Sequence, residues 1–225
     1  MTTIGQARRA GGSAARRHGP FTLGRICLVA LIVLIGAILL DTTYRSDDAE
    51  PAGRAQKFDA AEFGAENYES KVVPAIQQKA VDIVTLHKAI AADSDAAGQK
   101  YGNREGTGPY SYAVSLTGTA KEAENGLLRV DVPDLDDARV SVQIGPAVNG
   151  TALRDAVGFI KFGQFTNQVE YADAGTALNN QVKAKVLASL DVEALKDKKV
   201  TVVGAMTPLT PDVLTVTPVS IKAAS

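Results

Sequence analysis

The fold is decided by residues 110–144, which read YSYAVSLTGTAKEAENGLLRVDVPDLDDARVSVQI. Apolar and polar residues alternate over residues 110–117, 128–132 and 140–144, and this period of two is typical of half-buried β-strands. Asn125-Gly126 lies between the first two runs and favours a tight hairpin, because both residue types tolerate positive φ. The stretch therefore predicts an antiparallel meander of three strands.

The chain after the meander predicts helices and then two closing strands. Apolar residues return at helical spacing over residues 152–157 and 172–190, and strands follow over 200–206 and 213–221. Three strands, a helical insertion and a hairpin form the element order of the OB-fold. We therefore predict an α+β fold, with a small OB-like five-strand β-barrel over residues 109–222 and the helical insertion between strands 3 and 4.

Two local features of this region carry predictions of their own. Pro218 cannot donate to a strand ladder, so it must lie at an edge, at a strand terminus or at a bulge. Phe159, Phe162 and Phe165 are close together in the sequence, and such a cluster favours a core plug beneath the sheet.

Residues 57–92 come before the barrel and predict a helical preface. Val72, Ile76 and Ile83 recur at spacings that place them on one helix face. Pro74 interrupts this pattern, so we expect it in the first turn of a second helix or at a kink. Residues 93–109 contain four glycines and no apolar period, which predicts a loop.

The N-terminal part predicts a membrane anchor. Residues 26–40, ICLVALIVLIGAILL, contain no charge and no proline, and with residues 21–24 the run approaches the length that crosses a bilayer. The first 25 residues hold five arginines and no acid, which leaves 19 basic and 25 acidic residues and a net charge of −6 in the rest. This asymmetry places the N-terminus in the cytoplasm.

The predicted organisation is therefore a disordered cytoplasmic tail (1–20), a transmembrane signal anchor (21–41), a tether (42–56) and a periplasmic α+β domain (57–225), held at the inner membrane by a single pass. A cleaved signal peptide is the alternative, but residues 39–44, LLDTTY, lack the small residues that a peptidase needs. The one cysteine, Cys27, lies at the start of the apolar run, so a disulfide within the chain is impossible and lipidation is disfavoured.

The composition and motifs argue against several classes of site. An acidic body disfavours nucleic acid as a partner. The turn at residues 131–137 is rich in aspartate, but a calcium loop that starts at Asp134 would have Arg139 at position six and Gly145 at position twelve. His87 is the one histidine after the apolar run and has no second His or Cys to complete a metal site. We therefore expect no metal and no cofactor.

Residues 143–179, QIGPAVNGTALRDAVGFIKFGQFTNQVEYADAGTALN, carry a resemblance to a known family. The matching features are Gly145-Pro146 followed by GTALRD, the run FTNQ, and YA leading to ALN. On these motifs the chain resembles a family of predicted periplasmic lipoproteins typically encoded beside sugar ABC transporters. The family's lipidated cysteine after the apolar run is missing here, so this member is expected to hold the membrane by a helix. The resemblance implies no catalytic residues.

Two readings of function remain open. The first is a membrane-tethered periplasmic accessory or binding protein that assists a sugar ABC importer by touching its permease or its solute-binding protein, with no catalysis. The polar side chains of the motif would then form the contact surface: Thr151, Arg154, Asp155, Asn167, Gln168 and Glu170. The same residues have a local alternative, in which they pair with each other or satisfy backbone groups at helix ends and strand edges.

The second reading is a periplasmic hydrolase acting on a carbohydrate through a carboxylate pair such as Asp155 and Glu170. Nucleophilic catalysis would need a base beside a nucleophile, and the exported part offers no cysteine and one histidine. A nucleotide-binding OB module is disfavoured by the acidic charge. We therefore expect a protein that is not an enzyme, with the lipid bilayer and an importer component as its partners.

Overall fold

A computed structural model describes residues 23–41 and 58–223 of the chain, which divides into two compact units, residues 1–55 and 56–225. The predicted tail (1–20) and the predicted tether (42–56) lie outside the described residues.

The first unit contains one described helix, α1 (Leu23–Asp41), of 19 residues. The helix confirms the secondary structure expected for this segment. Seven of its large apolar side chains, from Leu28 to Ile35, are 48–65% exposed. Within residues 23–41 and 58–223, we find no helix that combines the length and the apolar character needed to cross a membrane.

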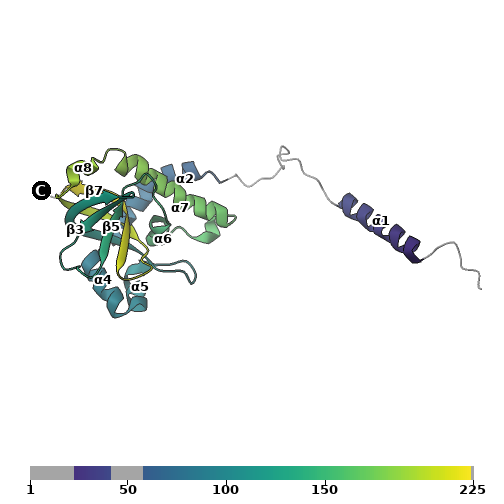
Figure 1. The fold of residues 1–225 in the computed structure, drawn as a ribbon, viewed down its shortest axis with the longest axis horizontal. Helices are drawn as coiled ribbons and strands as arrows, with labels where there is room; N and C mark the ends of the chain where they lie inside the picture. Colours follow the sequence, from purple (N-terminus) through teal and green to yellow (C-terminus); the bar gives the residue numbers. More distant parts are fainter. Residues whose placement is uncertain (1–22, 42–57, 224–225) are drawn as a thin grey trace, which may run out of the picture. The chain divides into compact units, whose positions relative to one another are not determined.

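Five strands of the second unit pair in a closed ring (Figure 1). They are β3 (Ser111–Glu124), β4 (Leu127–Asp131), β5 (Arg139–Gln143), β6 (Lys199–Met206) and β7 (Val213–Ala223). The order is β3-β4-β5-β7-β6, and β6 pairs again with β3; only the β5–β7 contact is parallel. The meander and the closing hairpin are therefore confirmed.

The hairpin between β3 and β4 turns at the predicted residues. Asn125 and Gly126 have φ values of 53° and 78°, which the paired strands require at a two-residue turn. Pro218 lies beside a bulge, because the β6–β7 register shifts between Val203 and Gly204. One of the three places expected for this proline is thereby confirmed.

β3 has more partners than a meander strand needs. Two short strands, β1 (Val81–Asp82) and β2 (Gly102–Asn103), pair with its first half. Residues 111–114 are buried on both faces, whereas the sequence predicts a half-buried strand there. The reason is that α3 (Val73–Lys79) and α6 (Ala152–Val157) pack on the outer face, which a period-two pattern alone does not reveal.

The core consists of two apolar clusters on opposite faces of the sheet. One lies inside the ring and includes Leu116, Leu128, Val142 and Leu214. The other lies between the sheet and the helices, and it includes Tyr68, Ile76, Leu153 and Leu178. The helices therefore share a core with the sheet, because they complete the burial of its outer face.

The preface is helical as predicted, in several pieces. These are α2 (Ala60–Asn67), a π-helical turn η1 (Tyr68–Val72), α3 and α4 (Ile83–Ala92). Pro74 lies in the first turn of α3, as expected.

The prediction of a loop over residues 93–109 is wrong in its first half, where the structure has α5 (Ser94–Tyr101). The Asp93 carboxylate accepts a hydrogen bond from the Ala96 N–H at 2.9 Å and starts the helix. The buried residues of α5 are Ala97 and Gly98, which are too small to produce an apolar period. A Cβ on Gly98 would lie 2.2 Å from the ring of Tyr110, so the glycine is required for this packing.

The insertion between β5 and β6 contains α6, a 3-10 turn η2 (Phe162–Gln164), α7 (Gln168–Val182), a π-helical turn η3 (Lys183–Leu187) and α8 (Val192–Leu195). The expected core plug of three phenylalanines is only partly present: Phe165 is partly buried and packs against the cluster between the sheet and the helices, whereas Phe159 and Phe162 do not. Phe159 and Phe162 are 38% and 39% exposed, because aliphatic side chains already fill the outer face of the sheet.

Candidate functional site

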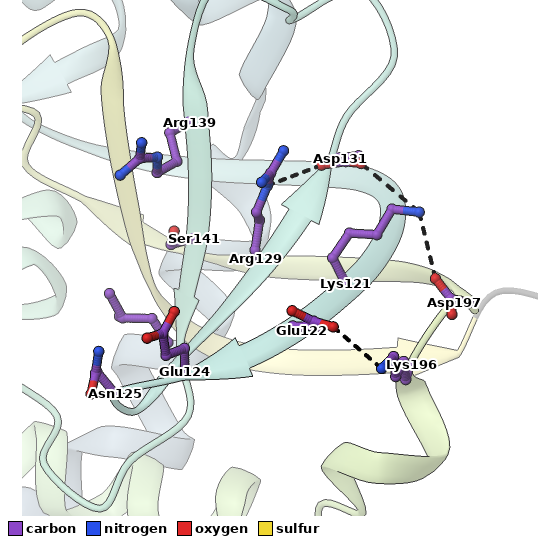
Figure 2. A pocket seen from close by; sticks show the side chains of 11 residues that line it. Lys121, Glu122, Glu124, Asn125, Arg129, Asp131, Arg139, Ser141, Lys196 and Asp197 are labelled. Atoms are coloured by element: carbon purple, nitrogen blue, oxygen red, sulfur yellow. Dashed lines mark ion pairs between the residues drawn. The ribbon is translucent and has the colours of Figure 1, made fainter.

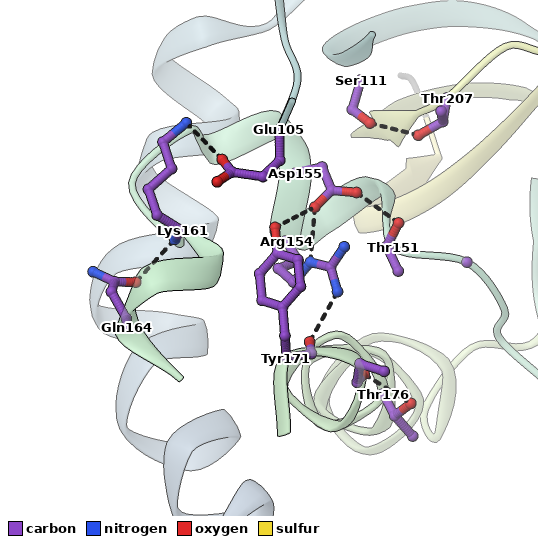
Figure 3. A network of polar contacts seen from close by, with 12 residues as sticks. Glu105, Ser111, Thr151, Arg154, Asp155, Lys161, Gln164, Tyr171, Thr176 and Thr207 are labelled. Atoms are coloured by element: carbon purple, nitrogen blue, oxygen red, sulfur yellow. Dashed lines mark hydrogen bonds and ion pairs between the residues drawn. The ribbon is translucent and has the colours of Figure 1, made fainter. Parts of the chain in front are cut away.

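A network of polar contacts joins α6 to the first turns of α7 (Figure 3). Arg154 and Asp155 are consecutive residues of α6, and Tyr171 faces them from α7. Arg154 is only 8% exposed, which is unusual for an arginine and requires that its charge be paired.

The guanidinium group of Arg154 is held from three directions. Its Nε donates to Asp155 Oδ1 at 2.7 Å, and its Nη1 donates to the backbone carbonyl oxygen of Tyr171 at 2.8 Å. Its Cζ lies 3.5 Å from the centroid of the Tyr171 ring, a close cation–π contact. In the part of the chain that the structure describes, no hydrogen bond engages its Nη2.

Asp155 accepts hydrogen bonds from two further donors. The Thr151 hydroxyl donates to Asp155 Oδ2 at 2.6 Å, and the Tyr171 hydroxyl donates to Oδ1 at 3.2 Å. Thr151 occupies the N-cap position of α6, but its hydroxyl binds Asp155 instead of a backbone N–H. The carboxylate is therefore fully engaged within its own network.

The environment keeps the phenol of Tyr171 protonated. Burial is the largest cause, and together with the neighbouring Asp155 carboxylate it raises the pKa of Tyr171 to about 12, although the Arg154 charge acts in the opposite direction. The hydroxyl therefore keeps its proton, and can donate it to Asp155, at a higher pH than an ordinary tyrosine would.

The network forms one wall of a groove of about 630 Å³. Its lining residues include Thr151, Arg154, Asp155, Gln168 and Tyr171 of the two helices, together with Glu105, Phe162 and Thr207. Figure 3 shows Thr151 and Asp155 on one helix with Tyr171 across from them. The groove thus combines a fixed positive group, an exposed amide and aromatic surface.

Four of the six predicted contact residues meet in this groove, and the other two have a different role. The Asn167 side chain accepts from the Glu170 N–H at 3.0 Å, and the Glu170 carboxylate accepts from the Thr166 N–H at 2.9 Å. The first bond caps the start of α7, and the second ties the preceding residue to its first turn. Tyr171 and Glu105 were missed, since no spacing in the sequence connects either residue to Arg154.

A larger hollow, of about 760 Å³, lies over β4 and β5 (Figure 2). Its charges pair with one another: Lys121 with Asp131 and Asp197, Arg129 with Asp131, and Lys196 with Glu122, at 3.3–3.9 Å. These side chains are largely exposed, so the pairs are screened and weak. This hollow is therefore a solvated face. The smaller groove is the better candidate for a binding site, because the buried Arg154 is held there in one geometry.

Among the described residues, no group of three or more metal-ligating side chains comes together. His87 is buried, and its Nδ1 lies 3.9 Å from Asp137 Oδ1 of the acidic turn. This contact joins α4 to the turn between β4 and β5.

Comparisons with known proteins agree with this description. A family model described as "Predicted periplasmic lipoprotein (DUF2291)" matches residues 27–222. A crystal structure of an OB-fold protein from Thermotoga maritima is similar with a TM-score of 0.61 and 17% sequence identity, over 74% of this chain and 99% of that chain. At this identity the likeness shows the fold alone. No curated protein matches the chain.

Proposed function

Because the chain belongs to the family of predicted periplasmic lipoproteins, we propose that it is a periplasmic accessory or binding protein of a sugar ABC transport system, without catalysis. The family match supports the compartment. The association with an importer is supported by the resemblance of residues 143–179 to a family encoded beside such transporters. The partner would be the permease or the solute-binding protein.

The proposal includes a single-pass anchor in the inner membrane formed by residues 21–41, with the N-terminus in the cytoplasm. The exposed apolar side chains of α1 and the arginines that precede it support this topology. The family match begins at residue 27 and so includes most of α1. If the helix is the anchor, a Cys27→Ser variant stays in the membrane fraction after alkaline extraction, whereas attachment by a lipid on Cys27 predicts its release.

The single observation that supports a binding role is that the guanidinium group of Arg154 is held in one geometry. Two of its nitrogens and its π-face are already engaged, so the group is fixed before any partner arrives. A fixed donor binds an acceptor without losing rotamer entropy. The Nη2 of Arg154 and the exposed Gln168 amide can donate hydrogen bonds to carbonyl or carboxylate oxygens of a partner's loop.

The hydrolase alternative, through Asp155 and Glu170, has less support. Glycosidic cleavage needs one carboxyl group that is protonated and another that is free to attack or to activate water. Asp155 is bound to Arg154, Thr151 and Tyr171, and Glu170 is bound to the Thr166 N–H. An Asp155→Asn variant that folds, still captures the partner and loses a hydrolytic activity would favour the enzyme.

The binding proposal is tested by crosslinking in cells that carry the full-length chain and the importer encoded beside it. A photoreactive residue replaces Gln168, which is exposed and lines the groove. The matched control carries the same residue at Glu193, which is exposed on α8. We expect a crosslink to the permease or the solute-binding protein from position 168 and none from position 193. Equal crosslinking from both positions, or none from position 168, would contradict the proposal.

A further inference from the structure

A hollow of about 380 Å³ lies at one end of the strand ring, and Arg154 does not line it. Its walls come from the end of α4, the first turn of α5, the segment 104–110 and the turn between β6 and β7. Tyr112 lines it from the ring itself, since this residue belongs to the inner apolar cluster and pairs with Met206, the last residue of β6. The mouth of a closed ring of strands is a common place for a small-molecule site, and the volume lies within the usual range of about 300–1,000 Å³.

Tyr112 forms the floor of the hollow, because it is 2% exposed whereas every other lining residue is half-buried or exposed. Among the described residues, no hydrogen bond engages its hydroxyl. The unpaired hydroxyl of Tyr68 is sealed from solvent, but that of Tyr112 is not, so it opens into the hollow. A polar side chain that is almost fully buried without a partner in the fold is unusual, and it indicates a position where a bound molecule supplies the partner.

The surroundings of Tyr112 make its hydroxyl a donor. Burial raises the pKa of this tyrosine, and the Tyr110 phenol and the Asp95 carboxylate act in the same direction. The group therefore keeps its proton and can donate a hydrogen bond to an acceptor in the hollow. The ring centroids of Tyr110 and Tyr112 are 6.4 Å apart, so the two phenols line neighbouring parts of the same surface.

In the part of the chain that the structure describes, one cation and one anion line the hollow. Arg104 lies over Tyr110, with Cζ 4.2 Å from the ring centroid, so the face of its guanidinium group is engaged while its N–H edge is free to donate. Asp95 lies in the first turn of α5. Neither residue forms an ion pair or a side-chain hydrogen bond with the other or with any other described residue. The hollow thus offers two opposite charges that are both without a counter-charge.

We propose that this hollow binds a small zwitterion of the size of an amino acid. The carboxylate of the ligand pairs with Arg104 and accepts a hydrogen bond from the Tyr112 hydroxyl, and its ammonium group pairs with Asp95. An apolar side chain of the ligand lies against Ile90 and Leu209, which line the same hollow. The site shares no charged residue with the groove lined by Arg154, so the inference does not depend on the proposed importer partner.

The charge pattern selects this class of ligand. An anion that pairs with Arg104 is repelled by Asp95, and a cation that pairs with Asp95 is repelled by Arg104. A neutral polyol leaves both charges without a counter-charge. A molecule that carries both charges a few bonds apart is the one that pairs with both residues.

The test measures binding of leucine to the full-length chain in detergent by isothermal titration calorimetry. Leucine is the probe because its aliphatic side chain matches the apolar wall. N-acetylleucine lacks the ammonium group, leucinamide lacks the carboxylate, and glucose is a neutral polyol. We expect leucine to bind about tenfold or more tightly than either derivative, because each derivative loses one charge-assisted contact, and glucose not to bind.

Three variants each remove one contact of the ligand. Tyr112→Phe should weaken leucine binding by about tenfold, and it should leave thermal unfolding unchanged because the hydroxyl has no partner among the described residues. Arg104→Gln should bind leucine no better than leucinamide, and Asp95→Asn should bind it no better than N-acetylleucine. Arg129→Gln is the control, because Arg129 is exposed on β4 and does not line this hollow. Its affinity for leucine should equal that of the wild-type chain.

Several results would overturn the proposal. These are no binding of leucine at millimolar concentration, equal affinity for leucine and its two derivatives, binding of glucose in place of leucine, and equal weakening in Arg129→Gln. A folded Tyr112→Phe chain that binds leucine as tightly as the wild type would remove Tyr112 from the site. None of these results bears on the crosslink from position 168, because none of the substituted residues lines the groove of Arg154.

Discussion

The guanidinium of Arg154 lies over the ring of Tyr171, with Cζ 3.5 Å from the ring centroid, and the same arginine donates to the backbone carbonyl of that tyrosine at 2.8 Å. One side chain thereby binds both the face and the backbone of a residue on another helix. The pair joins α6 to α7, and both residues line the groove.

Replacing Arg154 should destabilise the folded unit markedly. Arg154→Ala leaves the Asp155 carboxylate without its cation in a largely buried place, and breaking such a pair typically costs about 3–5 kcal/mol. Arg154→Lys should lose less, because an ammonium group keeps the charge but cannot bind Asp155 and the Tyr171 carbonyl in one plane. Urea unfolding measures both values.

The control for this prediction is Arg129→Ala. Arg129 pairs with Asp131 at 3.3 Å on the exposed face of β4. Its removal should change the free energy of unfolding by less than about 1 kcal/mol. Similar losses for Arg154→Ala and Arg129→Ala would show that the buried network does not hold α6 and α7 together.

The stability of the protein should fall at high pH through Tyr171. Its pKa is raised from 10.0 to about 12 in the folded state, so the unfolded state loses the proton first as pH rises. The contribution of this group is complete below pH 10 and is lost between pH 10 and 12. Unfolding free energies measured over this range should decline less steeply for Tyr171→Phe than for the wild-type chain.

Tyr68 and Tyr112 also have raised pKa values, chiefly because of burial, so they contribute to the same decline. Comparing the wild-type chain with Tyr171→Phe isolates the contribution of Tyr171, since Tyr68 and Tyr112 are unchanged in the variant. An identical slope in both proteins would mean that Tyr171 is not shielded from solvent. Phenolate absorbance provides an independent check of the titration.

Gly204→Ala should disrupt the β6–β7 pairing. A Cβ at this position would lie 2.3 Å from the Thr217 carbonyl oxygen and 2.7 Å from Val216 Cγ1, and the first of these is a backbone atom that cannot simply rotate away. Such overpacking costs about 1–3 kcal/mol or more. Gly163→Ala is the control, because nothing lies within 4 Å of the added carbon. Thermal unfolding should separate the two variants clearly.

Asn167→Ala should reduce stability through the lost helix cap, by about 0.5–2 kcal/mol. Asn167→Asp keeps an acceptor for the Glu170 N–H and should restore most of it. Urea unfolding measures how much the cap contributes to stability. Capture of the importer component measures any role of Asn167 in binding. If Asn167→Asp is stable but no longer captures the partner, Asn167 contacts that partner directly, contrary to its assignment here as a cap.

Much of the strand arrangement was predictable because it depends on local patterns. The period-two runs identified the meander, and Asn125-Gly126 located its first turn. The closing hairpin and α6 followed from the same reasoning. These elements are specified by neighbours in the sequence, so one chain is sufficient to recognise them.

The errors arise where distant residues decide the structure. α5 is helical because Gly98 fits beneath Tyr110 and Asp93 supplies a cap, and neither fact produces an apolar period. Phe159 and Phe162 are exposed because other side chains already fill the core. The groove depends on the contact between Arg154 on α6 and Tyr171 on α7. The sequence shows only that both residues belong to one motif.

Closure of the strand ring depends on β6, which follows every strand of the ring except β7 in the sequence. One edge of β3 pairs with the whole of β6, from Tyr112 with Met206 to Thr119 with Lys199. A nascent chain that has not yet produced residue 199 therefore exposes that edge and cannot complete its barrel-like ring. Until residues 199–206 have been synthesised the domain stays open along this edge, and a product truncated before β6 lacks the strand that joins β3 to β7.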